Sequence, residues 1–155
     1  MAIGTDAAIE FYGTQDTVTV AGGTSAVTSG AFSASGDVVS GGWTNDDDAP
    51  MASVTLECAY ASAPAANTFV SLYARLLNVS STNDAHTPDA NNPHYYLGVF
   101  PLNDSTSTQY ITIDVALPNA YTSQVYEFYI THNAGQTMSA GWKIYVTPKT
   151  LGPHA

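Results

Sequence analysis

The stretch QVYEFYITHNAGQTMSAGWKIYVTP, residues 124–148, decides the fold class. Apolar residues alternate with other residues before and after the turn signal Ala134-Gly135. A period of two is typical of β-strands with one buried and one exposed face. The residues expected on the buried face are Tyr126, Phe128, Ile130, Trp142, Ile144 and Val146. The stretch therefore predicts two strands separated by a turn.

The same period recurs from Met51 onward. Its expected buried sets are Ala52, Val54, Leu56, Cys58 and Tyr60; Val70, Leu72, Ala74 and Leu76; and Ile111, Ile113, Val115 and Leu117. The run HYYLGVF, residues 94–100, is apolar on both faces and predicts a central strand. No window has a helical period with caps at both ends. We therefore expect an all-β protein of about eight strands, an antiparallel two-sheet sandwich of the jelly-roll type rather than a closed barrel.

The amino-terminal third has a different composition. Of the 22 residues from Ala21 to Gly42, 17 are Gly, Ser, Thr or Ala, which lose much backbone entropy on ordering and bury little surface. We expect one domain, with an arm and weak strands over residues 1–50 and the sandwich core over 51–155. Two hypotheses stay open for the first segment. It is an arm that orders against a partner, or thin strands packed on the same domain.

The charge balance excludes several classes of partner. Three Lys and Arg residues stand against 13 Asp and Glu residues, and the net charge is −10. Nucleic acids and anionic membranes both require clustered cations, so we expect neither as a partner. The sequence MAIGTDAAIEF has no basic and apolar signal segment, and Cys58 is the single cysteine. We therefore expect folding in a reducing cytoplasm, with Cys58 as an inert core thiol.

Four tyrosines fall on the polar side of their predicted strands: Tyr73, Tyr110, Tyr129 and Tyr145. Tyrosine is enriched in protein interfaces because it offers a large contact area and one hydroxyl. Cross-strand aromatic pairs that cover the sheet are the alternative. We take these four, together with Phe11 and Tyr12 near the amino terminus, as candidate partner-binding residues.

No motif predicts catalysis or a cofactor. Asp46, Asp47 and Asp48 are the densest carboxylate group, but calcium-loop spacing is absent and a solvated turn is favoured over a metal site. His86, Asp89 and His94 match no zinc pattern, and Pro88 and Pro93 indicate a loop. There is no G-x-S-x-G elbow and no phosphate-binding glycine loop. We therefore expect a protein that is not an enzyme and needs no cofactor.

Three stretches together resemble a family of small virion proteins encoded among the head and tail genes of tailed bacteriophages. They are AIEFYGTQD, SLYARLLNVSSTNDAHTPDANNPHYYLGVFPLND and QYITIDVALPNAYTSQVYEFYITHNAGQTMSAGWKIYVTPKT. The resemblance supplies no catalytic residues. It implies a phage structural protein, with capsid decoration (cement) on the capsid exterior favoured over the tail. It also implies the major capsid protein and further copies of the chain, in a homotrimer, as partners, and synthesis in the cytoplasm of a host bacterium.

Two alternatives remain within the same resemblance. The first is a tail-associated receptor or carbohydrate-binding module, in which Trp43, Tyr95, Tyr96 and Trp142 would contact a glycan. Trp142 falls on a buried face, and Tyr95 and Tyr96 must split across two faces, which favours core positions. The second is a tail-tube or terminator protein that forms rings.

Overall fold

The computed structural model describes residues 8–77, 86–92, 95–120 and 123–153, and in these ranges it contains nine strands and no α-helix. The strands are β1 (Ala8–Tyr12), β2 (Asp16–Thr17), β3 (Trp43–Thr44), β4 (Met51–Cys58), β5 (Phe69–Leu77), β6 (Tyr95–Pro101), β7 (Gln109–Ala116), β8 (Val125–His132) and β9 (Lys143–Pro153). One 3-10 turn, η1 (Ser35–Asp37), precedes β3. In the part of the chain described, no helix has the length and apolar character needed to cross a membrane.

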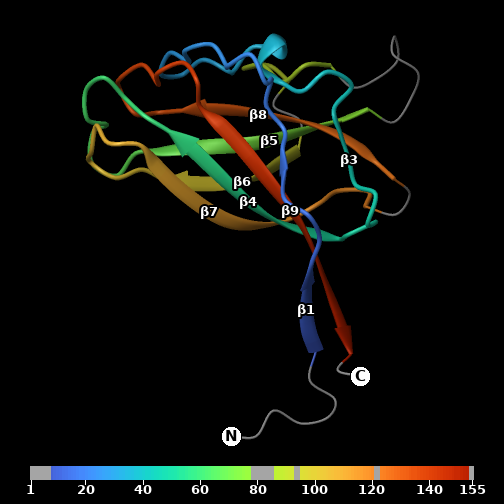
Figure 1. The fold of residues 1–155 in the computed structure, drawn as a ribbon. Helices are drawn as coiled ribbons and strands as arrows, with labels where there is room; N and C mark the ends of the chain where they lie inside the picture. Colours follow the sequence, from blue (N-terminus) through green and yellow to red (C-terminus); the bar gives the residue numbers. More distant parts are fainter. Residues whose placement is uncertain (1–7, 78–85, 93–94, 121–122, 154–155) are drawn as a thin grey trace, which may run out of the picture.

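The strands form two antiparallel sheets (Figure 1). One has the order β1-β9-β4-β7, with β2 also paired to β9, and the other has the order β3-β8-β5-β6. Pairing is nested about the middle of the chain: β1 and β2 pair with β9, β3 with β8, β4 with β7, and β5 with β6. A long hairpin rolled in this way across two sheets is a jelly roll. The predicted all-β sandwich is confirmed.

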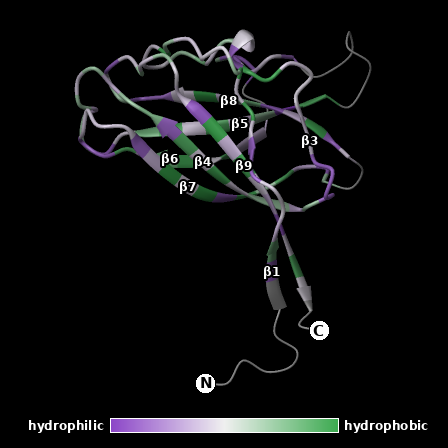
Figure 2. Cartoon of the chain, in the orientation of Figure 1, coloured by the Kyte–Doolittle hydropathy of each residue, from purple (hydrophilic) through white to green (hydrophobic). Residues whose placement is uncertain are grey.

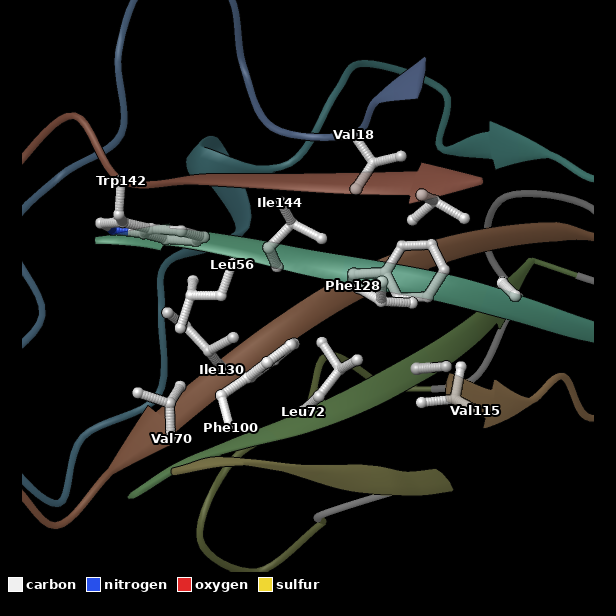
Figure 3. Close-up of a cluster of buried hydrophobic side chains, with 14 of the residues drawn as sticks. Val18, Leu56, Val70, Leu72, Phe100, Val115, Phe128, Ile130, Trp142 and Ile144 are labelled. Carbon is white, nitrogen blue, oxygen red and sulfur yellow. The ribbon is translucent and has the colours of Figure 1, made fainter. Parts of the chain in front are cut away.

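The core lies between the inner faces of the two sheets (Figure 3). Along β4, buried residues alternate strictly with half-buried ones, as the period of two predicts. Leu56 from this strand, Leu72 from β5 and Ile130 from β8 are all fully buried. Figure 2 shows the resulting alternation of hydrophobic and hydrophilic residues along the strands. The expected buried sets of β4, β5, β8 and β9 are confirmed.

The prediction of a central strand at residues 94–100 is wrong. β6 is the edge of its sheet, and Tyr95, Tyr96 and Val99 are exposed. A register shift in its pairing with β5, between Leu72 and Tyr73, alters the alternation of β6. Gly98 also approaches the first sheet closely, because a Cβ there would lie 3.0 Å from Ile113 Cδ1. The apolar character on both faces therefore reflects an edge strand that contacts the opposite sheet.

The glycine- and serine-rich segment lies on the sandwich as bridges and thin strands. Val27 and Val38 of the segment are buried, and single bridges join Val27 to Met138 and Phe32 to Thr131. Asp37 fixes the segment, because its carboxylate accepts hydrogen bonds from Ser25 N at 2.6 Å and from Ala34 N at 3.0 Å. Sparse apolar anchors and backbone bonds thus order the segment against its own domain.

His132, at the end of β8, ties this segment to the second sheet. Its Nε2–H donates to the Val27 carbonyl at 2.9 Å, and its Nδ1 accepts from Ala134 N at 3.3 Å. Its ring and the Tyr60 ring form a T-shaped pair, with centroids 5.6 Å apart. This pair of bonds requires the neutral imidazole. Burial lowers the pKa of His132 below its ordinary value, and the Val27 carbonyl partly opposes the shift.

Acid is therefore expected to destabilise the fold through His132. The unfolded chain takes up a proton at the ordinary histidine pKa of about 6.5, whereas the folded chain resists it. The contribution is complete above that pH and declines as pH falls through it. Denaturant titrations at about pH 7 and about pH 5 should show a smaller acid-induced loss in His132→Gln than in the unchanged protein. The exposed His86 is the control, since His86→Gln should keep the full loss. An equal loss in all three proteins contradicts this role.

Candidate functional site

Tyr73 and Tyr129 lie on the outer face of the second sheet, in register on β5 and β8. Tyr129 is fully buried, and its hydroxyl donates to Glu127 Oε2 at 2.9 Å, which Arg75 also contacts at 2.8 Å. Burial, and secondarily Glu127, raises the pKa of Tyr129 to about 12. The half-buried Tyr73 contacts the Phe32 ring at 5.2 Å and the Tyr96 ring at 5.6 Å between centroids. Tyr129 therefore belongs to the internal packing of this chain.

Tyr110 and Tyr145 lie on the outer face of the first sheet. The Tyr145 hydroxyl donates to Glu57 Oε2 at 2.5 Å, and Lys143 Nζ contacts the same oxygen at 3.5 Å. The hydrogen bond to Glu57, more than burial, raises the pKa of Tyr145. Tyr110 is 66% exposed beside them, opposite Glu57 in register. Tyr145 is thus held within the sheet face, and Tyr110 stands open to solvent.

The four tyrosines therefore do not form one surface. Two belong to each sheet, and the outer faces of a sandwich point in opposite directions. Equal strand parity places a side chain outside its sheet, but it does not say which sheet. Tyr73 and Tyr129 are cross-strand neighbours, whereas Tyr110 and Tyr145 share a sheet face but lie on β7 and β9, with β4 between them.

Phe11 and Tyr12 lie on a different element, the terminal ribbon, which consists of residues 8–12 of β1 and residues 149–153 of β9. Figure 1 shows it extending away from the sandwich, with the start of β1 and the end of β9 at its far end. Phe11 is 50% exposed, and Tyr12 and Leu151 are each 56% exposed. Phe11 packs on Gly152, where a Cβ would lie 2.7 Å from Phe11 Cε2. The ribbon thus concentrates apolar side chains outside the core.

Leu151 was not predicted from the sequence. The alternation that we quote from the sequence stops at Pro148, yet β9 continues to Pro153 and pairs with β1 over this last part. The available signal was the alternation Thr147, Lys149, Leu151, which continues the outer face of β9 beyond the proline. Proline is tolerated in a strand where its missing N–H faces an unpaired position.

Lys149 fixes the base of the ribbon. Its Nζ lies 2.8 Å from Glu10 Oε1 and 2.7 Å from Asp114 Oδ2, and 5.6 Å from the centroid of the Tyr12 ring. The Tyr12 hydroxyl donates to Glu10 Oε2 at 2.7 Å. The two carboxylates raise the pKa of Lys149, and Lys149 in turn is the largest cause of the lowered pKa values of Glu10 and Asp114. The cluster joins β1, β7 and β9 and sets the direction of the ribbon.

An open groove of about 240 Å³ lies where the ribbon meets the sandwich. Its lining residues are Phe11, Tyr12, Gly13, Asp47, Ala49, Pro148, Lys149 and Thr150. The groove is continuous with the exposed side chains of the ribbon. Apolar side chains and a carboxylate therefore meet at one pole of the molecule.

The aspartates of residues 46–48 form a turn beside this groove. Asp48 has a positive φ of 47°, and its Oδ1 accepts a hydrogen bond from Ser123 N at 2.7 Å. Asp46 and Asp47 are exposed. Within the described residues, no three His, Cys, Asp or Glu side chains are grouped as a metal site would require.

The next residues are the histidine, aspartate and cysteine candidates that the sequence singled out. Asp89 accepts hydrogen bonds from Asn91 N and Asn92 N, which lower its pKa and close a turn beside His86. His94 lies outside the described residues. Cys58 is buried, and desolvation raises the pKa of its thiol to about 12. Asp89 therefore holds its own turn, and Cys58 lies in the core as predicted.

The four carbohydrate candidates divide into two pairs. Trp43 and Trp142 are buried, and the Trp142 indole donates to the Ser25 carbonyl at 2.8 Å. Tyr95 and Tyr96 are exposed on the edge strand β6. The tryptophans therefore belong to the core, and only the two tyrosines are accessible to a ligand.

No protein-family model matches the chain, and no curated protein matches it. Among solved structures, the chain is similar to PRD1 vertex protein P5 at 13% identity, with a TM-score of 0.41. That match covers 96% of this chain and 98% of the other.

Proposed function

We propose that the chain is a structural protein of a bacteriophage virion that decorates the exterior of the capsid. Its partners are then the major capsid protein and further copies of itself in a homotrimer. The proposal rests on the sequence resemblance to phage virion proteins and on one structural observation. β1 and the last part of β9 leave the two-sheet sandwich as one ribbon that carries exposed apolar side chains. A rigid body with a protruding attachment element suits a protein that works by binding its neighbours.

The mechanism needs no reaction and no cofactor. Each copy contributes a modest contact area, and repetition over a closed shell turns many weak contacts into strong overall attachment. Copies that bridge neighbouring capsid subunits add buried surface, which opposes expansion of the shell. The nested strand pairing provides the rigid body that such a bridge requires.

The test is co-sedimentation with capsids. The major capsid protein encoded in the same gene cluster is assembled without this chain, and the purified protein is added back. The proposal expects saturable binding at a fixed ratio to capsid subunits, and higher thermal stability of the decorated shell. Absence of binding, with the protein folded and the shells intact, contradicts it. Mass measurement in solution tests the trimer separately from a hexameric ring.

A tail-associated glycan-binding role is the second candidate, and the exposure of Tyr95 and Tyr96 favours it. An exposed aromatic ring on a sheet edge can stack on a sugar. A glycan array with the isolated protein separates the two roles. Binding that is lost in Tyr96→Ala, together with no capsid co-sedimentation, would support the tail role.

A further inference from the structure

The terminal ribbon has unpaired backbone along its outer edges. In the described part of the chain, β1 pairs with β9 alone, and the pairing of β9 with β4 ends at Lys149. Gly13 N donates to the Pro148 carbonyl at 2.9 Å, so the alternation of an antiparallel pair turns the N–H and C=O groups of Phe11 toward β9. The same alternation turns those of Glu10 and Tyr12 outward. A partner strand could therefore bond to this edge.

This edge carries only part of the protection found on natural edge strands, since its one charged residue is Glu10. Inward-turned charges, prolines and exposed lysines are the usual protection. β1 has the sequence AIEFY with no proline, and Lys149 Nζ is held by two carboxylates with its side chain only 5% exposed. Phe11 and Tyr12 instead present apolar surface along the edge. A two-stranded ribbon is marginal alone, and a third strand would stabilise it.

The exposed charges around the ribbon favour a basic partner surface. Arg75, Lys143 and Lys149 each form an ion pair with a carboxylate of this chain. Around the ribbon the exposed charges are carboxylates, with Asp46 and Asp47 exposed and the Glu10 side chain 47% exposed. A second copy would bring the same carboxylates and a charge of −10 to this pole. Like charges oppose that contact, whereas lysines or arginines on a partner favour it.

We infer that the terminal ribbon is the attachment element, and that it pairs through the free edge of β1 with a strand edge flanked by Lys or Arg on the capsid protein. This inference rests on the proposed function and identifies the surface that performs it. Backbone bonds supply affinity, Phe11 and Leu151 bury against apolar surface of the partner, and the carboxylates fix orientation and speed encounter. The Lys149 cluster holds the ribbon formed before binding, which reduces the ordering cost.

The experiment compares ribbon variants in capsid co-sedimentation with the full chain. Tyr12→Pro removes an outward N–H of β1, and Tyr12→Ala is its matched control, because it loses only the side chain. We expect Tyr12→Pro to weaken binding at least about tenfold more than Tyr12→Ala. The double variant Phe11→Ser with Leu151→Ser should also bind at least about tenfold more weakly. Tyr110→Ser, which removes a more exposed tyrosine from another surface, should bind as the unchanged protein does.

Three further readouts make the outcomes distinct. Thermal melting should show that every variant is folded, because all substituted residues lie outside the core. If the double variant does not fold, the single variant Leu151→Ser replaces it. Binding should weaken as salt rises from about 0.05 to about 0.5 M, since exposed charges are screened. Solution mass should stay the same in all variants.

If the unchanged protein does not bind capsids, the proposed function fails. If it binds and the ribbon variants bind equally well, the function stands and the ribbon inference is overturned. Binding that does not change with salt concentration overturns the inference that the partner surface is basic. A lower solution mass in the ribbon variants overturns the inference in favour of a second copy on this edge.

Discussion

Phe100→Ala is expected to lower the free energy of unfolding by about 4 kcal/mol. Phe100 is fully buried on the inner face of β6, opposite Val70 in register, and lies in the cluster drawn in Figure 3. Because β6 is an edge strand, its aromatic ring is its main anchor to the core. Truncation removes apolar contacts and leaves a cavity between the sheets, and both effects destabilise the fold.

The neighbouring strand supplies a matched control. Phe69 is 38% exposed at the start of β5, so Phe69→Ala should cost about 1 kcal/mol or less. Denaturant titrations of the two variants measure the difference directly. Equal losses would show that the sandwich interior does not carry the stability that its burial implies.

Gly42→Ala is expected to cost about 3 kcal/mol, from a steric clash added to backbone strain. Gly42 has a φ of +76°, and a Cβ there would lie 2.6 Å from Val125 Cγ1 and 2.9 Å from the Tyr126 carbonyl oxygen. That oxygen belongs to β8, which pairs with β3 immediately after Gly42. Relief of the clash would therefore disturb the sheet pairing of Trp43.

A substitution at Gly41 separates the steric clash from the backbone strain. Its φ is +83°, but a Cβ there would meet nothing within 4 Å. Gly41→Ala should therefore cost only the conformational strain, about 1 kcal/mol. Unfolding free energies from denaturant titration should differ by about 2 kcal/mol between the two variants. Similar values would mean that β3 can move away from β8 at little cost.

The interior was largely predictable from the sequence because burial imposes a period of two on each strand. Leu56, Leu72 and Ile144 were all placed on the correct face in this way. The run at residues 94–100 misled the prediction, since an edge strand that contacts the opposite sheet looks apolar on both sides. Alternation records which side of a strand is buried, but not its neighbours.

The candidate site was less predictable for the same reason. Tyr129 and Tyr110 both fall on the predicted polar side of their strands. Tyr129 is nevertheless fully buried, whereas Tyr110, on the other sheet, is 66% exposed. Phe11 and Tyr12 were candidates, but their partner strand at residues 149–153 is more than 130 residues away in the chain. Long-range pairing of the two chain ends creates the ribbon, and no local pattern encodes it.

The most direct test of the account is the copy number of this chain in purified virions, measured by quantitative protein analysis against the major capsid protein. Capsid decoration predicts a fixed ratio of this chain to the capsid protein. The ratio should correspond to three copies of the chain at each occupied symmetry position of the shell. Absence from the particle, or only the few copies of a tail ring, would contradict it.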